Sequence, residues 1–188
     1  MNLELQRQQE YESQRLDQLP TYEVFLQMKH GKSYEHVGIV HAATADMAFI
    51  FGKEQFSRRY TCTGMWVVPS HGVWVTECTE LEENVYDHIA DFSEESDELE
   101  ESYEIFHLSK RGKQHKHAGQ VWANSHSQAL IKAKHQFDHG KPVLNIWAIK
   151  TKDIKAIDEE DQVIWSTLPE KNASRCYFIQ SRRKVKSI

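Results

Sequence analysis

The sequence lacks most of the patterns that identify an enzyme or a membrane protein. It contains no G-x-S-x-G, P-loop or G-x-G-x-x-G motif. No apolar run is long enough to span a bilayer, and residues 1–14 have no apolar signal-peptide core. Three cysteines, Cys62, Cys78 and Cys176, are too widely spaced for a C-x-x-C pair. We therefore expect reduced thiols, a cytoplasmic protein without membrane contact, and no catalytic residue in this chain.

What the sequence does contain is a 48-residue stretch that occurs twice. Residues 22–69 align without a gap with residues 103–150, at a constant offset of 81 positions. Chance gives about three identities in such an alignment at average residue usage. The chain has sixteen, each with its partner 81 residues later: Tyr22, Glu23, Phe25, Lys29, Gly31, Lys32, His36, Gly38, Val40, Ala42, Ala48, Ile50, Lys53, Gln55, Phe56 and Trp66. The chain is thus an internal duplication.

Charge and composition divide the chain further. Residues 1–102 carry 7 Lys/Arg against 20 Asp/Glu, whereas residues 103–188 carry 16 against 8. Such asymmetry favours two halves that attract each other as an intramolecular pseudo-dimer over a charged surface for a partner. The predicted domains are a polar N-terminal helix or tail (1–20), the first repeat (21–92), an acidic linker (93–102), the second repeat (103–180) and a basic tail (181–188).

Hydrophobic periodicity gives each repeat the order ββαβ. In the first repeat, strands are predicted over 22–28, 36–41 and 65–69, with a helix that begins after the N-cap Thr44. Ser125 is the corresponding cap, and short later strands are predicted at 73–75 and 162–165. The predicted fold class is therefore α+β, with two tandem ββαβ(β), β-grasp-like repeats, each with one helix packed on a small mixed sheet.

The eleven histidines do not form a predicted metal site. His135 and His139 are four residues apart on a predicted helix, and His115 and His117 flank a lysine, but no Cys or carboxylate set accompanies them. We expect these to be surface histidines. The one Glu-x-x-His, Glu104 to His107, lies in a predicted strand, where the two side chains point to opposite faces. We expect no metal and no cofactor.

Two surfaces are candidates for contact with other molecules. The turns after the first strand of each repeat are basic, and Met47, Ile50 and Phe51 add apolar surface outside the main stripe of the first helix. That extra face predicts a cover, either the other repeat or another subunit. The candidate partner-contact residues are Lys29, Lys32, His36, Met47, Phe51, Lys110, Lys113 and His117.

The ordered pattern of the first repeat resembles the PaaB family. The residues that carry the resemblance are Tyr22-Glu23-Val24-Phe25, Gly31, His36-Val37-Gly38, His41-Ala42 and Trp66-Val67-Val68-Pro69, and the pattern recurs more weakly over 103–180. In the second repeat Ala118, Trp122 and Lys150 replace Val37, His41 and Pro69. That family is the small B subunit of a bacterial phenylacetyl-CoA epoxidase. The resemblance implies a β-grasp-like fold and a duplication of the usual single unit.

The resemblance also implies a non-catalytic role beside two partners, a di-iron catalytic subunit and its scaffold homologue. The sequence alone leaves an alternative open, a free-standing module that binds nucleic acid or a small ligand through the basic second repeat. Against nucleic acid, the matching turn of the first repeat lies in an acidic half, and no aromatic-rich RNA-recognition strand is present. We therefore expect an accessory subunit of an oxygenase complex.

Overall fold

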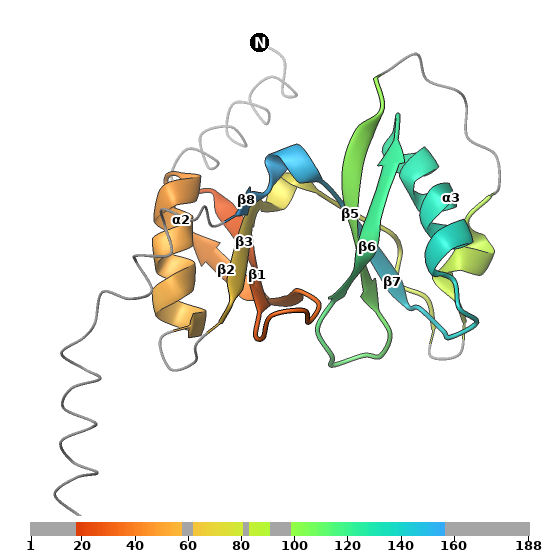
Figure 1. Cartoon of the computed structure of the whole chain (residues 1–188), viewed down its shortest axis with the longest axis horizontal. Coiled ribbons are helices and arrows are strands. Elements are labelled where there is room, and N and C mark those ends of the chain that lie inside the picture. Colours follow the sequence, from red (N-terminus) through yellow and green to blue (C-terminus); the bar gives the residue numbers. More distant parts are fainter. Residues whose placement is uncertain (1–17, 58–61, 81–82, 91–98, 157–188) are drawn as a thin grey trace, which may run out of the picture. The chain divides into compact units, whose positions relative to one another are not determined.

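The computed structural model describes residues 18–57, 62–80, 83–90 and 99–156, all within one compact unit, Met1–Ala156 (Figure 1). Among the described residues, no helix has the length and apolar character needed to cross a membrane. The elements are, in chain order, β1 (Thr21–Gln27), β2 (Glu35–His41), α2 (Ala45–Gly52), β3 (Gly64–Pro69), β4 (Val73–Val75), β5 (Glu101–Leu108), β6 (Lys116–Ala123), α3 (His126–Phe137), β7 (Asn145–Lys150) and β8 (Lys155–Ala156).

The two helices begin at the predicted N-caps. The Thr44 hydroxyl accepts a hydrogen bond from the Met47 amide at 3.3 Å, and the Ser125 hydroxyl accepts one from the Gln128 amide at 3.2 Å. Gln128 also reaches back, and its Oε1 accepts from the Asn124 amide at 2.7 Å. These bonds satisfy amides that would otherwise lack a partner at the first turn of each helix. The predicted caps are therefore confirmed.

The strands form one eight-stranded sheet with the order β4-β7-β5-β6-β2-β1-β3-β8. Every pairing in the described part of the chain is antiparallel. The predicted mixed sheet is therefore wrong. Each helix returns the chain along the sheet, so that β3 runs in the same direction as β2 and pairs antiparallel with β1 on its other side. The α+β class is confirmed, whereas the β-grasp-like arrangement is not.

A β-bulge at the same place in both repeats explains why both have glycine at the corresponding positions Gly38 and Gly119. The register of β1 against β2 shifts between Val24 and Phe25, beside Gly38, and β5 shifts against β6 beside Gly119. The backbone φ is +145° at Gly38 and +156° at Gly119, a region that side chains disfavour. The aromatic ring of Phe56 or Phe137 fills the space over each glycine, within 2.8 Å and 2.5 Å of where a Cβ would stand.

The two repeats exchange their last strands. β4 follows β3 after the short 3-10 helix Ser70–Gly72, yet it pairs with β7 of the second repeat. β8 follows β7 in the same way and pairs with β3 of the first repeat. In the middle of the sheet, β2 and β6 meet at Glu35 and Lys116, whose side chains form an ion pair at 2.7 Å. The fourth strand of each repeat therefore completes the sheet of the other.

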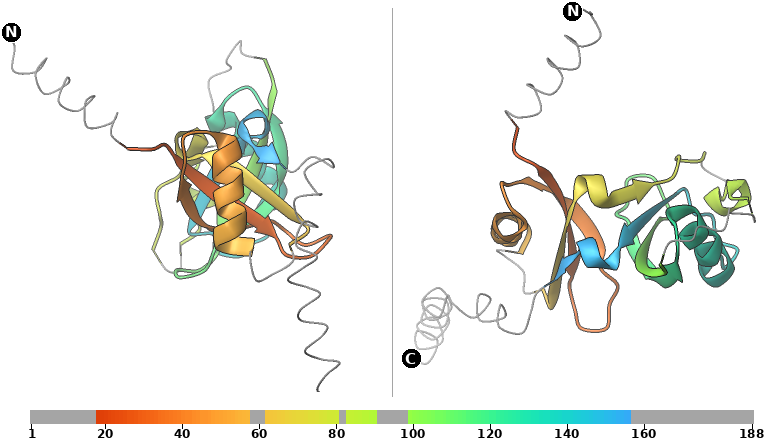
Figure 2. Two further views of the ribbon diagram at one scale, coloured as in Figure 1. Left: turned by 90° about the vertical axis from the view of Figure 1, so that its left-hand side faces the viewer. Right: turned by 90° about the horizontal axis from the view of Figure 1, so that it is seen from above.

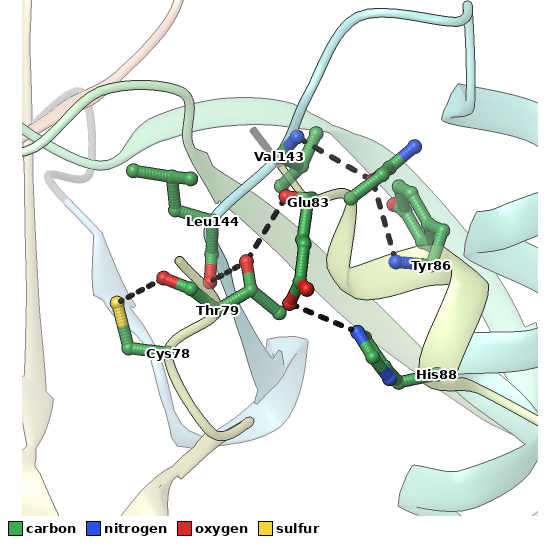
Figure 3. Close-up of polar contacts among 8 residues, drawn as sticks. Cys78, Thr79, Glu83, Tyr86, His88, Val143 and Leu144 are labelled. Carbon is green, nitrogen blue, oxygen red and sulfur yellow. Dashed lines mark hydrogen bonds and ion pairs between the residues drawn. The ribbon is translucent and has the colours of Figure 1, made fainter. Parts of the chain in front are cut away.

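The chain after β4 continues along the second repeat (Figure 3). The Thr79 amide donates to the Leu144 carbonyl at 2.9 Å, and the Val85 amide donates to the Val143 carbonyl at 2.7 Å. Val85 and Tyr86 are buried in the core of the second repeat, together with residues of α3 and β5 to β7. The described residues 73–80 and 83–90 thus precede the second repeat in sequence but pack as part of it.

The alternation of side chains gives each half-sheet two apolar faces. On one face α2 or α3 covers its own strands, as the two rotated views show for α2 (Figures 1 and 2). A Cβ added to Gly52 of α2 would meet the Val24 side chain at 3.3 Å there, and α3 buries Ala129, Leu130 and Ala133. The opposite face carries Phe25 and Val68 of the first repeat with their counterparts Phe106 and Ile149, which form one core cluster between the repeats.

Several predictions from the sequence fall outside the described residues. These are the N-terminal segment up to residue 17, most of the acidic linker, the strand at 162–165 and the basic tail. β5 begins at Glu101, two residues before the predicted start of the second repeat. Cys62 and Cys78 are free thiols, and Cys176 lies outside the described part.

Candidate functional site

Two carboxylate–imidazole pairs lie between the repeats, at positions related by the offset of the duplication. Nε2 of His36 donates to Glu23 at 2.7 Å, and Nε2 of His117 donates to Glu104 at 2.6 Å. All four side chains are largely buried, with 19% of His36, 14% of Glu23, 20% of His117 and 7% of Glu104 exposed. Buried polar groups of this kind are retained only when they are hydrogen-bonded.

The other oxygen of each carboxylate is also occupied. The Ser70 hydroxyl donates to Glu23 at 2.8 Å, and the Thr151 hydroxyl donates to Glu104 at 3.2 Å. Gln120 adds a further bond to Glu104 at 2.9 Å. A Ser–His nucleophile requires the hydroxyl to donate to the imidazole, whereas both hydroxyls here donate to the carboxylate instead. The arrangement therefore fixes strands and turns to each other and does not activate a nucleophile.

Aromatic rings extend these pairs across the boundary between the repeats. The rings of Phe25 and Phe106 lie 4.5 Å apart between centroids. His36 meets the edge of Trp147 at 4.9 Å, and His117 meets Trp66 at 5.4 Å, so each imidazole contacts the tryptophan of the other repeat. Edge-to-face contacts of this kind add about 0.5–1.5 kcal/mol each beyond area burial.

Backbone hydrogen bonds join the same strands. The His36 amide donates to the His115 carbonyl at 2.9 Å, and the His117 amide donates to the Tyr34 carbonyl at 2.8 Å. These two bonds are related by the same offset of 81 positions. The pairs, the rings and the backbone bonds therefore form one cluster with approximate twofold symmetry, which we call the inter-repeat cluster: Glu23, Phe25, Tyr34, His36, Trp66, Glu104, Phe106, His115, His117 and Trp147.

The two repeats differ at one position of this cluster. Tyr34 stacks on Trp66 with the centroids 3.8 Å apart, and His115 takes the corresponding place on Trp147 at 3.9 Å. Nε2 of His115 is hydrogen-bonded to Asn145 at 2.8 Å. Burial lowers the pKa of His115, because an apolar stacking site disfavours the charged imidazolium. His115 thus acts as a neutral aromatic ring here.

The predicted partner-contact residues separate into two groups. Lys29, Lys32, Lys110 and Lys113 are exposed on the β1–β2 and β5–β6 turns, where Gly31 and Gly112 have positive φ. Those turns adjoin the contact between β2 and β6. His36 and His117, by contrast, lie in the inter-repeat cluster. The expectation that His115 and His117 are surface histidines is wrong, because strand pairing between the repeats covers them.

The remaining predicted contacts lie on α2. Met47 and Phe51 are each 41% exposed, and Ile50 between them is 51% exposed. The described residues of the second repeat therefore leave this face open to solvent. The sequence predicted that either the other repeat or another subunit covers the apolar face of α2. The described residues of the second repeat do not cover it.

The histidines do not assemble a metal-binding group in the described part of the chain, where no three His, Cys, Asp or Glu side chains lie close enough to share an ion. α3 ends at Phe137, so His139 does not share a helix face with His135 as predicted. Glu104 and His107 point to opposite faces of β5, as predicted: Glu104 bonds to His117, and His107 accepts from the Tyr86 hydroxyl at 2.6 Å.

Part of the inter-repeat cluster has a signal in the sequence. Glu23 and His36 are polar residues in predicted strands, and both recur 81 positions later. A polar pair that a duplication retains inside two sheets indicates a shared hydrogen bond. Two further pairs of corresponding positions, Ser70/Thr151 and Tyr34/His115, hold different residues in the two repeats. Comparison of the repeats therefore could not identify them as part of this arrangement.

Comparison with known proteins gives two findings. The model of a protein family described as "PaaB: Phenylacetic acid degradation B" matches residues 18–91 and again residues 100–184. A curated relative from Escherichia coli (strain K12), named as a subunit of 1,2-phenylacetyl-CoA epoxidase, is 34% identical over 76 residues, which are 37% of this chain and 80% of the relative. The relative therefore aligns with one repeat's length of this chain. No solved structure matches.

Proposed function

Because the chain belongs to the PaaB family, whose model matches both of its repeats, we propose that it is a subunit of an oxygenase complex of the phenylacetyl-CoA epoxidase kind, acting in phenylacetate catabolism. Its role is to hold the di-iron catalytic subunit and the scaffold homologue of that subunit together in the cytoplasm. It contributes no catalytic residue of its own.

The inter-repeat cluster is the observation that carries the non-catalytic role. The partly buried carboxylates of Glu23 and Glu104 and imidazoles of His36 and His117 are hydrogen-bonded in pairs, and each carboxylate also accepts from a neighbouring hydroxyl. These hydrogen bonds join strands and turns within each repeat, and each imidazole also contacts the tryptophan of the other repeat, so the groups serve the fold and the joining of the two repeats. Side chains suited to contact another protein, such as those of α2 and of the basic turns, lie on the outside.

Coexpression with the other epoxidase subunits tests the proposal. We expect the chain to elute in size-exclusion chromatography with the di-iron subunit and its scaffold homologue, in fixed stoichiometry. A chain that elutes alone while its partners associate without it would contradict the proposed role. For the non-catalytic part, we expect the His36→Gln/His117→Gln variant to leave the turnover per assembled complex unchanged, and a loss of turnover in an intact complex would refute it.

The basic turns favour a second candidate function, binding of nucleic acid or of a small anionic ligand. Lys29 and Lys32 on one turn and Lys110, Arg111 and Lys113 on the other are exposed, and both turns adjoin the strands that meet at Glu35 and Lys116. This function predicts binding at low salt that weakens as salt rises and when the three residues of the second turn are changed to Gln. Absence of binding to single-stranded DNA or RNA at 50 mM salt, roughly the low end of the usual range, would exclude a nucleic-acid ligand.

A further inference from the structure

The fold explains most of the residues that are identical in the two repeats. The identical aromatic and aliphatic side chains are largely buried in the cores or lie in the inter-repeat cluster. The glycine of each basic turn has positive φ, +77° at Gly31 and +76° at Gly112. The shared lysine of the helices has a bonded partner in the second repeat, where Nζ of Lys134 donates to the Ile89 carbonyl at 2.9 Å.

The lysines of the two turns have no such explanation. Lys29 and Lys32 of the first repeat recur as Lys110 and Lys113, and all four are exposed. None of these four side chains forms an ion pair or a hydrogen bond within the described part of the chain. Five other lysines there are each ion-paired with a carboxylate: Lys116, Lys132, Lys150, Lys152 and Lys155.

The geometry of the turns does not require lysine either. The Lys32 amide donates to the Lys29 carbonyl at 3.0 Å, and the Lys113 amide donates to the Lys110 carbonyl at 3.1 Å. These bonds use backbone atoms alone, so other residue types could make them. The same turn thus presents the same two unpaired charges in each repeat, beside the contact between β2 and β6.

Charge and the neighbouring rings indicate the class of partner. Unpaired ammonium groups suit an anionic surface. The chain has a net charge of −5, so its overall field disfavours a long polyanion such as a nucleic acid. The ring next to each turn, Tyr34 or His115, is already stacked on a tryptophan of its own repeat, so it does not form an open platform for bases. Two lysines per turn instead suit short-range contact with carboxylates on another protein.

We propose that Lys29 with Lys32, and Lys110 with Lys113, are two equivalent docking contacts for acidic surfaces of the other subunits of the complex. This inference rests on the proposed function, because it names the residues and the chemistry by which the chain contacts its partners. The approximate twofold symmetry of the inter-repeat cluster gives each repeat one such contact. Exposed ion pairs are screened by salt, so these contacts weaken as salt rises.

The test titrates the full chain into the other epoxidase subunits at low and at high salt. Lys29→Gln/Lys32→Gln removes one lysine pair, Lys110→Gln/Lys113→Gln removes the other, and a fourfold variant removes both. We expect each double variant to bind about three- to tenfold more weakly at low salt, since exposed ion pairs contribute modestly. The fourfold variant should lose roughly the product of the two effects, because the turns act at separate sites. Arginine at the same four positions keeps the charge and should preserve binding.

A control variant tests whether net charge alone matters. Lys132→Gln/Lys152→Gln removes two charges from lysines that are ion-paired within the chain. We expect it to bind as the unchanged chain does. An equal loss in this control would overturn the proposal. Circular dichroism melting of each variant separates loss of docking from loss of folding.

The outcomes distinguish this inference from the proposed function. If the unchanged chain forms no complex, the proposed function fails and the inference fails with it. If the complex forms and the folded lysine variants bind as well as the unchanged chain, only the inference is refuted. A loss confined to one turn refutes the equivalence of the two contacts. Variants that still bind the subunits but no longer bind single-stranded RNA would identify nucleic acid as the ligand and overturn the proposal.

Discussion

At the scale of single residues, the deepest polar groups are stabilised by specific neighbours. His107 and Tyr86 are held together away from water, so that a neutral phenol donates to a neutral imidazole. Burial lowers the pKa of His107 from 6.5 to about 4 and raises the pKa of Tyr86, since both charged forms lose hydration. This bond fixes the segment after β4 to β5 of the second repeat.

The lowered pKa of His107 makes stability depend on pH. Because the unfolded chain binds the proton at about pH 6.5 and the folded one only near 4, the stability present above pH 6.5 is lost as the pH falls towards 4. The loss is about 3 kcal/mol at most. Urea denaturation at pH 7 and at pH 4.5 measures it. His107→Gln should lose less stability on acidification than the unchanged chain. Equal losses, with exposed His135→Gln as a control, would contradict this.

Glu104 gives a second prediction at this scale. Glu104→Leu leaves His117, Gln120 and Thr151 without their common acceptor, and we expect it to lower the free energy of unfolding by about 2–4 kcal/mol. Glu104→Gln keeps an acceptor oxygen and should cost less. Chemical denaturation of both variants decides the point. A Leu variant as stable as the Gln variant would show that the carboxylate is not what joins these groups.

At the scale of elements, local sequence signals predicted much of the structure. Alternation located β1, β2 and β3, and the Thr44 and Ser125 caps located the helix starts, because these signals arise from neighbours within a few residues. The strand at 73–75 was also predicted correctly. Its pairing with β7 was not predicted, because the alternation of three residues indicates which faces their side chains occupy but not which strand they pair with.

The bulge beside Gly119 is an element-scale feature that a single methyl group tests. Gly119→Ala places a Cβ in a disfavoured φ region and 2.5 Å from the Phe137 ring, so the ring must move away. We expect a loss of about 2 kcal/mol or more in the free energy of unfolding. Gly112→Ala is the control, since its φ is also positive but no atom lies within 4 Å of an added Cβ. If the two variants lose the same stability, packing of Phe137 is not the cause.

At the scale of the whole molecule, the exchange of β4 and β8 makes each repeat depend on the other. The duplication could be predicted from the sequence, since sixteen identities at one offset do not arise by chance. The family relationship could be predicted from the ordered pattern of the first repeat. The inter-repeat cluster could be predicted from the sequence only in part, because contacts such as that between His36 and Trp147 join segments more than 100 positions apart. No local pattern encodes such a pairing.

The exchange predicts the behaviour of a cut chain. A protease site inserted after Glu95, in the predicted linker, divides the chain between the repeats. We expect the two fragments to stay together as one particle of unchanged mass in native light scattering, because β4 pairs with β7 and β8 pairs with β3 across the cut. They should separate only under denaturant. Fragments that separate in buffer, and fold independently, would rule out the exchange.

The covalent joining of the repeats also changes how the exchanged sheet forms. Two separate chains that swap strands must meet in solution, so the fraction assembled falls as the protein is diluted. In one chain the second repeat is covalently tethered to the first, and short tethers give effective concentrations on the order of millimolar. The reciprocal pairing of β4 and β8 is then a unimolecular step. The melting temperature of this chain should accordingly be independent of its concentration, even at nanomolar levels where swapped dimers dissociate.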